Sequence, residues 1–377
     1  MIIGIDITML VYTGSGVANY TYNLVKNLLE IDKKNKYRLF YSSLRRPKNF
    51  YYLDKLRSLG ASVYEWPIPP SVLEFLWGKS HLVPIEMFTG KVDVFYTSDY
   101  LRPPLMMGTK GITTVHDLIW KLYPDLHERR IIEAHERKLQ KIIKYRDTVV
   151  VDSSNTKNDL LRLYPQFDKR NIRVIYPGVR NDMAPIEDKQ KIEKILSKYF
   201  AGFSIANTKY LLYVGAIEPR KNLDIAIRAF HKLTTDHQSL VTNFLIAGKM
   251  GWKNESIYKL VHDLKLEDRV KFIGFVEDAD LPYLYSGAKL LIYLSSYEGF
   301  GLPPLEALAC GTKVLAGDNS SMKETIDEKY LVDIKNEAAV TDKMTTLLAD
   351  KSEVDWKKIK NKFSWKKAAR EFLKILA

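Results

Sequence analysis

The sequence has very little cysteine and no long uncharged apolar run. Cys310 is the single cysteine among 377 residues, which excludes an intramolecular disulfide and a metal site built from several thiolates. No apolar stretch approaches the roughly 20 residues that cross a bilayer as a helix. The chain opens with strand-like sequence instead of a signal peptide. These absences predict a protein of the reducing cytoplasm.

Signatures of nucleic-acid binding are also missing, although the chain is basic. Its formal net charge is +13, and residues 1–180 contain 28 Lys and Arg against 18 Asp and Glu. With no zinc finger or RNA-binding signature, this charge does not indicate nucleic acid as a partner. A basic first half suits a phosphate-bearing substrate or an anionic membrane surface.

The apolar residues that are present follow an alternation of strand and helix that starts twice. Such alternation predicts an α/β protein with two Rossmann-like doubly wound domains that face each other across a cleft. We place the first domain at residues 1–180, a linker and helix at 181–206, and the second domain at 207–358. A final helical segment covers 359–377.

The motif Glu298-Gly-Phe-Gly-Leu-Pro-Pro-Leu-Glu306 is the most informative stretch of the sequence. It joins a buried strand, predicted up to Tyr297, to a helix predicted over 304–310. Two glycines allow a ligand to approach the backbone, and a helix N-terminus suits phosphate. The alternative interpretation is a Gly-Pro turn that carries two surface acids.

Three other loops contain candidate site residues. Gly14 and Gly16 lie between a strand and a helix, where a phosphate or a plain turn fits equally well. His116 and Asp117 end a buried strand, where a ligand contact competes with a structural histidine. The cations Arg220 and Lys221 suit a diphosphate, and the alternative is an exposed charge pair.

The spacing of Glu298 and Glu306 around Gly-Phe-Gly-Leu-Pro-Pro resembles the signature of retaining glycosyltransferases of family 4, which have the GT-B fold. The Thr-Val-His-Asp-Leu run is similar to that of mannosyltransferase-like members. By this resemblance Glu306 contacts the donor's ribose and Glu298 contacts the transferred sugar. His116 then lies near that sugar and assists the reaction, and Asp117 supports it or contacts the acceptor.

The resemblance also assigns the donor's phosphates and base. It implies that Arg220 and Lys221 stabilise the leaving diphosphate and that the final segment crosses back to the first domain. The second domain then binds the nucleotide, and the first binds the acceptor. The remaining donor contacts implied are Gly14, Gly16, Val276, Gly299, Phe300, Gly301 and Leu302.

The expected function is therefore transfer of a hexose, with retention, from a nucleotide-diphosphate sugar to a glycan or lipid-linked glycan. GDP-mannose is the favoured donor, and UDP-sugars remain open. We expect no cofactor and no metal, since Asp278 and Asp280 precede a helix and suit capping. The alternatives are a sugar-nucleotide epimerase of the same fold and a non-catalytic nucleotide-sugar binder.

Aromatic and basic residues between positions 45 and 77 leave two interpretations open. They suit peripheral contact with the inner face of an anionic membrane. Alternatively, the aromatic rings pack inside the first domain.

Overall fold

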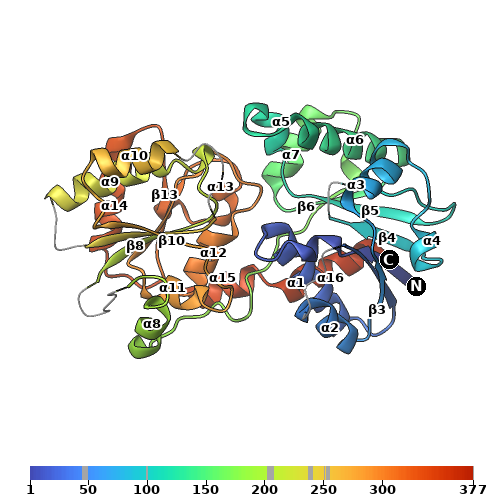
Figure 1. Cartoon of the computed structure of the whole chain (residues 1–377), viewed down its shortest axis with the longest axis horizontal. Helices are drawn as coiled ribbons and strands as arrows, with labels where there is room; N and C mark the ends of the chain where they lie inside the picture. The colour runs from blue at the N-terminus through green and yellow to red at the C-terminus, as the bar shows by residue number, and fades with distance from the viewer. Residues whose placement is uncertain are drawn as a thin grey trace. The chain divides into compact units, whose positions relative to one another are not determined.

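A computed structural model describes residues 1–44, 50–98, 101–201, 208–236, 241–249, 251 and 255–376. It divides the chain into two compact units (Figure 1). The first unit contains Met1–Gly178 and Phe363–Ala377, and the second contains Val179–Lys362. The segment expected as a linker, 181–206, thus lies in the second unit, and the returning C-terminal segment begins at Phe363.

The first unit is built on a seven-stranded, fully parallel sheet with the order β3-β2-β1-β4-β5-β6-β7. Its strands are β1 (Ile2–Asp6), β2 (Lys36–Ser42), β3 (Ser62–Trp66), β4 (Val94–Thr97), β5 (Lys110–Val115), β6 (Thr148–Val151) and β7 (Ile172–Val174). The order reverses between β1 and β4. In doubly wound sheets, ligands bind at the carboxyl ends of the strands beside such a reversal.

Helices cover both faces of this sheet, with α1, α2 and α16 on one face and α5, α6 and α7 on the other (Figure 1). The helices and helical turns are η1 (Thr8–Val11), α1 (Gly16–Ile31), α2 (Tyr51–Ser58), α3 (Pro70–Leu73), η2 (Glu74–Lys79), α4 (Glu86–Thr89), α5 (Ile119–Leu122), η3 (Pro124–Leu126), α6 (Arg129–Tyr145), α7 (Ser154–Leu163), η4 (Lys169–Asn171) and α16 (Trp365–Leu376). The near-continuous apolar strands are explained by this double cover, because parallel sheets bury both faces.

The second unit repeats the same design with six parallel strands in the order β10-β9-β8-β11-β12-β13. The strands are β8 (Tyr210–Val214), β9 (Asn243–Ala247), β10 (Val270–Gly274), β11 (Leu290–Tyr293), β12 (Val314–Gly317) and β13 (Leu331–Val332). The helices and turns are α8 (Lys189–Leu196), η5 (Pro219–Lys221), α9 (Leu223–Asp236), α10 (Glu255–Asp263), α11 (Leu281–Gly287), α12 (Leu302–Ala309), α13 (Met322–Thr325), η6 (Glu328–Tyr330), α14 (Glu337–Ala349) and α15 (Trp356–Lys362). Here the order reverses between β8 and β11, which fixes where a ligand is expected.

The last helix, α16, completes the core of the first unit. Its buried side chains, among them Trp365, Ala369 and Phe372, join the apolar cluster that α1, β1 and β2 form. The chain crosses tightly at this point, since a Cβ atom added at Gly178 would lie 2.0 Å from the backbone nitrogen of Trp365. Only a glycine leaves room for that crossing.

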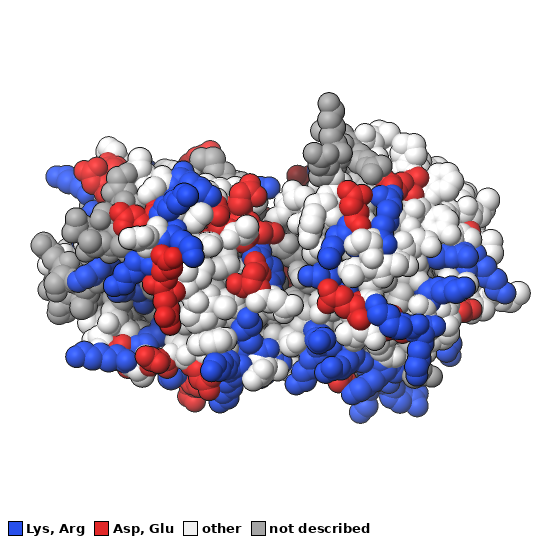
Figure 2. All heavy atoms as spheres, turned by 90° about the horizontal axis from the view of Figure 1, so that it is seen from below, with Lys and Arg blue, Asp and Glu red and all other residues white. Residues whose placement is uncertain are grey.

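The two units differ in surface character. The first contains 31 Lys and Arg against 19 Asp and Glu, and the second contains 27 against 26. Figure 2 views the side of the first unit that holds α2 and α16, where blue side chains outnumber red ones. Among the described residues, 14 of the 15 exposed large hydrophobic side chains belong to the first unit, and Phe275 is the exception.

The aromatic residues between 50 and 77 divide between core and surface. Phe50 and Trp77 are buried, whereas Tyr51 and Phe75 are 65% and 58% exposed. Packing inside the first unit is therefore confirmed for part of this region, and membrane contact stays a prediction for the exposed rings. Arg45, Arg46 and Lys48 lie outside the described residues. No helix in the described part of the chain combines the length and the apolar character needed to span a membrane.

Candidate active site

The second unit brings two predicted loops together at the reversal of its sheet. Strands β8 and β11 are neighbours, with Leu211 paired to Leu290 and Leu212 to Leu291. The loop after β8 carries Arg220 and Lys221, and the turn after β11 carries Glu298. Asn222 fastens the two loops, because its side-chain amide donates to the carbonyl of Leu294 at 2.7 Å and to Ser296 Oγ at 2.9 Å.

Glu298, Arg220 and Lys221 form one buried ion cluster. The Oε1 atom of Glu298 accepts hydrogen bonds from Lys221 Nζ at 2.5 Å and from Arg220 Nη1 at 2.9 Å. The hydroxyl of Tyr293 lies 3.0 Å from the same oxygen. Arg220 also pairs with Glu218. The cluster thus contains two cations and two carboxylates, so its charges are balanced.

The cations decide the charge state of Glu298. Burial alone raises the pKa of a carboxyl group, but Lys221 and Arg220 outweigh that effect and hold the pKa of Glu298 at about 2. Burial lowers the pKa of Lys221, and the Glu298 carboxylate opposes this shift. Glu298 is therefore ionised at every physiological pH and keeps its partners fixed.

The turn from Glu298 to Glu306 has the backbone that its glycines allow. Gly301 adopts φ of 83°, a left-handed conformation that favours glycine, and a Cβ atom there would lie 2.1 Å from Met322 Cε. Helix α12 begins directly afterwards at Leu302, two residues earlier than predicted. The reason is that prolines are tolerated in the first helical turn, where the amides have no intrahelical acceptor.

Glu306 lies one turn inside α12, and its polar contacts are separate from the ion cluster around Glu298. Its Oε2 atom accepts a hydrogen bond from the hydroxyl of Tyr285 at 3.0 Å. Burial raises the pKa of Glu306, and the nearby guanidinium of Arg180 opposes the rise. The oxygens of this buried carboxyl group can accept hydrogen bonds from hydroxyl groups such as those of ribose.

The structure corrects the expected role of the Asp-x-Asp triplet. Asp280 occupies the N-cap position of α11, but its side chain makes no capping hydrogen bond. It accepts from Tyr199 at 2.7 Å and Lys198 at 3.2 Å instead, and Asp278 pairs with Arg180 at 3.4 Å. Capping is wrong because stronger charged and hydroxyl donors lie within reach. Val276 is buried and follows β10, the edge strand of the six-stranded sheet, so it lies near the carboxyl ends of these strands.

The first unit holds the other four predicted residues. Gly14 has φ of 77° before α1, and Ser15 caps this helix by accepting from the amide of Ala18, so Gly16 is its first residue. His116 follows β5, and its Nδ1 lies 2.6 Å from Oδ2 of Asp152. Asp117 turns back on its own chain and accepts from the amide of Ile119 at 3.0 Å.

Sequence reasoning missed several partners of these residues. Glu218, Tyr293 and Tyr285 carry no motif of their own, and only the fold shows that they contact Arg220, Glu298 and Glu306. Asp152, the partner of His116, belongs to no predicted motif either, and its neighbour Ser153 caps α7. The available signal was position: Asp152 follows β6 directly, as His116 follows β5.

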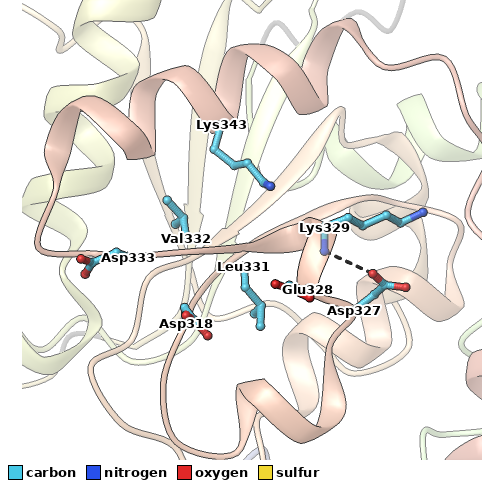
Figure 3. Close-up of a pocket in the computed structure, with 8 residues that line it drawn as sticks. All are labelled: Asp318, Asp327, Glu328, Lys329, Leu331, Val332, Asp333 and Lys343. Carbon is cyan, nitrogen blue, oxygen red and sulfur yellow. Dashed lines mark hydrogen bonds between the residues drawn. The ribbon is translucent and has the colours of Figure 1, made fainter.

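A separate hollow of about 550 Å³ lies beside η6 and β13 (Figure 3). Four carboxylates line it, from Asp318, Asp327, Glu328 and Asp333, together with Lys329 and Lys343. This excess of negative charge disfavours a diphosphate. Within the described ranges, no three His, Cys, Asp or Glu side chains are grouped in a way that suits a metal ion.

Comparison with known proteins agrees with the geometry of both units. The family described as Glycosyltransferase Family 4 matches residues 14–182, and Glycosyl transferases group 1 matches residues 198–371. The O-antigen chain mannosyltransferase B of Escherichia coli is 28% identical over 66% of this chain and 63% of its own length. The O-antigen chain mannosyltransferase RfbU of Salmonella typhimurium is 33% identical over 54% of this chain and 51% of its own length. The chain thus spans under two thirds of these relatives.

Solved structures show the same fold over the whole chain. Sucrose-phosphate synthase from Thermosynechococcus elongatus has a TM-score of 0.74 at 19% identity and covers 100% of this chain and 98% of its own. Anabaena HepE, in complex with UDP and glucose, has a TM-score of 0.70 at 16% identity, with coverage of 100% and 98%. These likenesses confirm the GT-B fold class. The two family matches show that the chain is a glycosyltransferase in which a Glycosyltransferase Family 4 domain is followed by a Glycosyl transferases group 1 domain.

Proposed function

We propose that this chain transfers a hexose, with retention of anomeric configuration, from a nucleotide-diphosphate sugar to a hydroxyl of a glycan or lipid-linked glycan. Mannose from GDP-mannose is the favoured donor, in line with the mannosyltransferase names of the relatives. The observation that carries the proposal is the Arg220, Lys221 and Glu298 cluster at the reversal between β8 and β11.

Each group in the cluster has a role in this proposal. Negative charge grows on the diphosphate as the glycosidic bond breaks, and buried cations stabilise such charge strongly because little water screens them. Arg220 and Lys221 supply those cations, and the amides at the start of α12 supply aligned dipoles. With two cations placed there, we propose that the reaction needs no metal.

Binding of the donor changes partners within the cluster. Glu298 accepts hydrogen bonds from Lys221, Arg220 and Tyr293, and its side chain is 11% exposed. Glu218 pairs with Arg220 alone within the cluster, and its side chain is 18% exposed. We propose that the diphosphate takes the place of Glu218 beside Arg220. Glu298 then stays in place and orients both cations toward the donor.

The experiment that tests the proposal starts with donors and then adds acceptors. Thermal shifts with GDP-mannose, UDP-glucose, UDP-galactose and free nucleotides identify the donor; product analysis with candidate glycans follows. Transfer with retained configuration is the expected result. An epimer formed from donor alone indicates the epimerase, and donor binding without any product indicates a non-catalytic binder. Either result contradicts the proposal.

We also propose peripheral contact with anionic lipid at the cytoplasmic side of a membrane. The surface formed by η2, the turn that follows it and the end of α6 exposes Phe75 and Leu82 at 58% and 57%. The same segments expose Lys79, Lys144 and Arg146. His81 stacks on Tyr145, so the two segments are continuous. Apolar side chains ringed by cations bind anionic interfaces.

Vesicle sedimentation tests this contact. The protein is expected to bind vesicles that contain phosphatidylglycerol and not vesicles of phosphatidylcholine alone. Phe75→Ser with Leu82→Ser is expected to release it. Lys366→Glu with Lys367→Glu on α16 is the control, because it lowers the charge of the same unit away from this surface. If both double variants lose vesicle binding equally, the net charge of the unit, and not this surface, binds the vesicles.

A further inference from the structure

Two polar residues end neighbouring strands of the first unit at the same level. Strands β5 and β6 are parallel, and Val115 is paired with Val151 as the last pair of the ladder. His116 and Asp152 are the residues that follow. Because neighbouring strands lie about 4.8 Å apart, side chains at matched positions on one sheet face touch. The fold therefore places this histidine beside this carboxylate.

The contact is short and enclosed. Nδ1 of His116 lies 2.6 Å from Oδ2 of Asp152, whose side chain is 7% exposed. Among the described residues, this is the one hydrogen bond of the Asp152 carboxylate, because its Oδ1 atom is buried without a partner. Burial raises the pKa of Asp152, and the histidine opposes the rise. A buried carboxylate oxygen without a hydrogen bond lowers the stability of the fold. The single contact of Asp152 therefore indicates that its role is to hold His116.

The imidazole also packs against aromatic rings. The ring of Tyr20 meets it edge-to-face, with centroids 4.7 Å apart, and Trp365 packs on Tyr20 in the same manner at 5.3 Å. Tyr20 belongs to α1 and Trp365 to α16. The second ring nitrogen, Nε2 of His116, is buried and has no hydrogen-bond partner in the described part of the chain. It is the nitrogen left for a ligand.

We propose that Asp152 is a positioning residue for the sugar transfer, an inference that rests on the proposed function. Its carboxylate accepts the Nδ1–H of His116, which fixes the ring orientation and leaves the lone pair of Nε2 to accept a hydrogen bond from a sugar hydroxyl. Asp152 itself touches neither donor nor acceptor. The same division of labour between a carboxylate and an imidazole fixes the tautomer in other enzymes.

The strand β6 offers a matched control for the test. Asp147 immediately precedes this strand as Asp152 immediately follows it, and Asp147 is also buried in a charged contact, with Arg102 Nη2 at 2.7 Å. Asp147→Asn therefore disturbs a buried carboxylate at the opposite end of the same strand, away from His116. Any effect of general destabilisation appears in both variants, and an effect through His116 appears only in Asp152→Asn.

Two measurements complete the test. In kinetics, Asp152→Asn is expected to lower kcat about 100-fold, with the KM for the donor changed less than about threefold. Asp147→Asn is expected to keep the wild-type kcat at assay temperatures below the melting temperature of this variant. In NMR of ¹⁵N-histidine-labelled protein, assigned with His116→Gln, wild type is expected to show the Nδ1–H tautomer. Asp152→Asn is expected to lose it, and Asp147→Asn to keep it.

The NMR result is independent of activity, so the two proposals fail separately. Absence of transfer in wild type with every donor overturns the proposed function, while the tautomer result still reports on Asp152. If wild type is active and Asp152→Asn keeps full kcat, or if the tautomer is the same in both, the role of Asp152 is overturned.

Discussion

Lys221 Nζ lies 2.5 Å from Oε1 of Glu298, and both side chains are buried. Removing Glu298 leaves Lys221 as an uncompensated buried charge, which costs about 3–5 kcal/mol, whereas removing both costs far less. Glu298→Gln is therefore expected to destabilise the chain more than the double variant with Lys221→Met. Urea unfolding of both single variants and the double variant measures the difference. Additive losses would show that the pair is not coupled.

Glu298 also predicts an acid-sensitive stability. Its pKa lies at about 2 in the folded chain against 4.5 ordinarily. A depressed carboxyl pKa contributes stability above the unfolded value, and that stability is lost as pH falls from about 4.5 toward 2, by about 3 kcal/mol in all. Urea unfolding across pH 2–6 measures the loss. Glu298→Gln is expected to show a shallower pH dependence, and equal slopes in both proteins would contradict the assignment.

Glu306 is expected to bind the donor's ribose. Replacement with alanine removes hydrogen bonds to a carboxylate, each worth about 1.5–3 kcal/mol, so donor affinity is expected to fall at least about tenfold. Calorimetric titration with the nucleotide sugar measures the affinity. Tyr285→Phe serves as the control, because it removes the hydroxyl contact of Glu306 and keeps the carboxylate. Unchanged affinity in Glu306→Ala would exclude the ribose contact.

Gly16 tests whether the diphosphate lies against the loop before α1. A Cβ atom at this position meets no atom within 4 Å, and the residue begins a helix. Gly16→Ala is thus expected to keep or raise the melting temperature, because alanine has less freedom in the unfolded chain. Donor affinity is expected to fall about tenfold, because the methyl group meets the ligand. An unchanged affinity would remove Gly16 from the donor site.

Glu218 is expected to compete with the donor for Arg220. Their ion pair must open before a phosphate takes the same guanidinium. Glu218→Gln is therefore expected to tighten donor binding about three- to tenfold, since the competing charge is gone. Titration at two salt concentrations measures the change. Weaker binding would mean that Glu218 orients Arg220 for the donor, which contradicts the exchange of partners.

Much of the fold follows from the sequence because it depends on local patterns. Runs such as 210–214 and 290–293 are apolar, short and bounded by glycine or polar loops, which predicts buried parallel strands. The two doubly wound units follow from their alternation with helices. The start of α12 was placed two residues late, since nothing local decides which proline-rich position first becomes helical.

Contacts between residues far apart in the sequence could not be predicted from the sequence. Arg220, Lys221 and Glu298 were each assigned to a ligand, and the structure joins them to one another. The sequence predicts Asp278 and Asp280 as caps, but their partners are Arg180, Lys198 and Tyr199, which lie about 80 to 100 positions away in the chain. Such partners follow from strand order, which local periodicity does not specify.

The return of α16 to the first unit has a consequence for how the protein is made. Trp365, Ala369 and Phe372 fill the core beside α1, yet the ribosome adds them only after the entire second unit. The leading 178 residues must wait with an open apolar face until the segment from Phe363 onward has been made, whereas residues 179–362 already form a contiguous unit. A chain cut short near residue 362 would leave that face uncovered and prone to aggregate, however well its trailing half had folded.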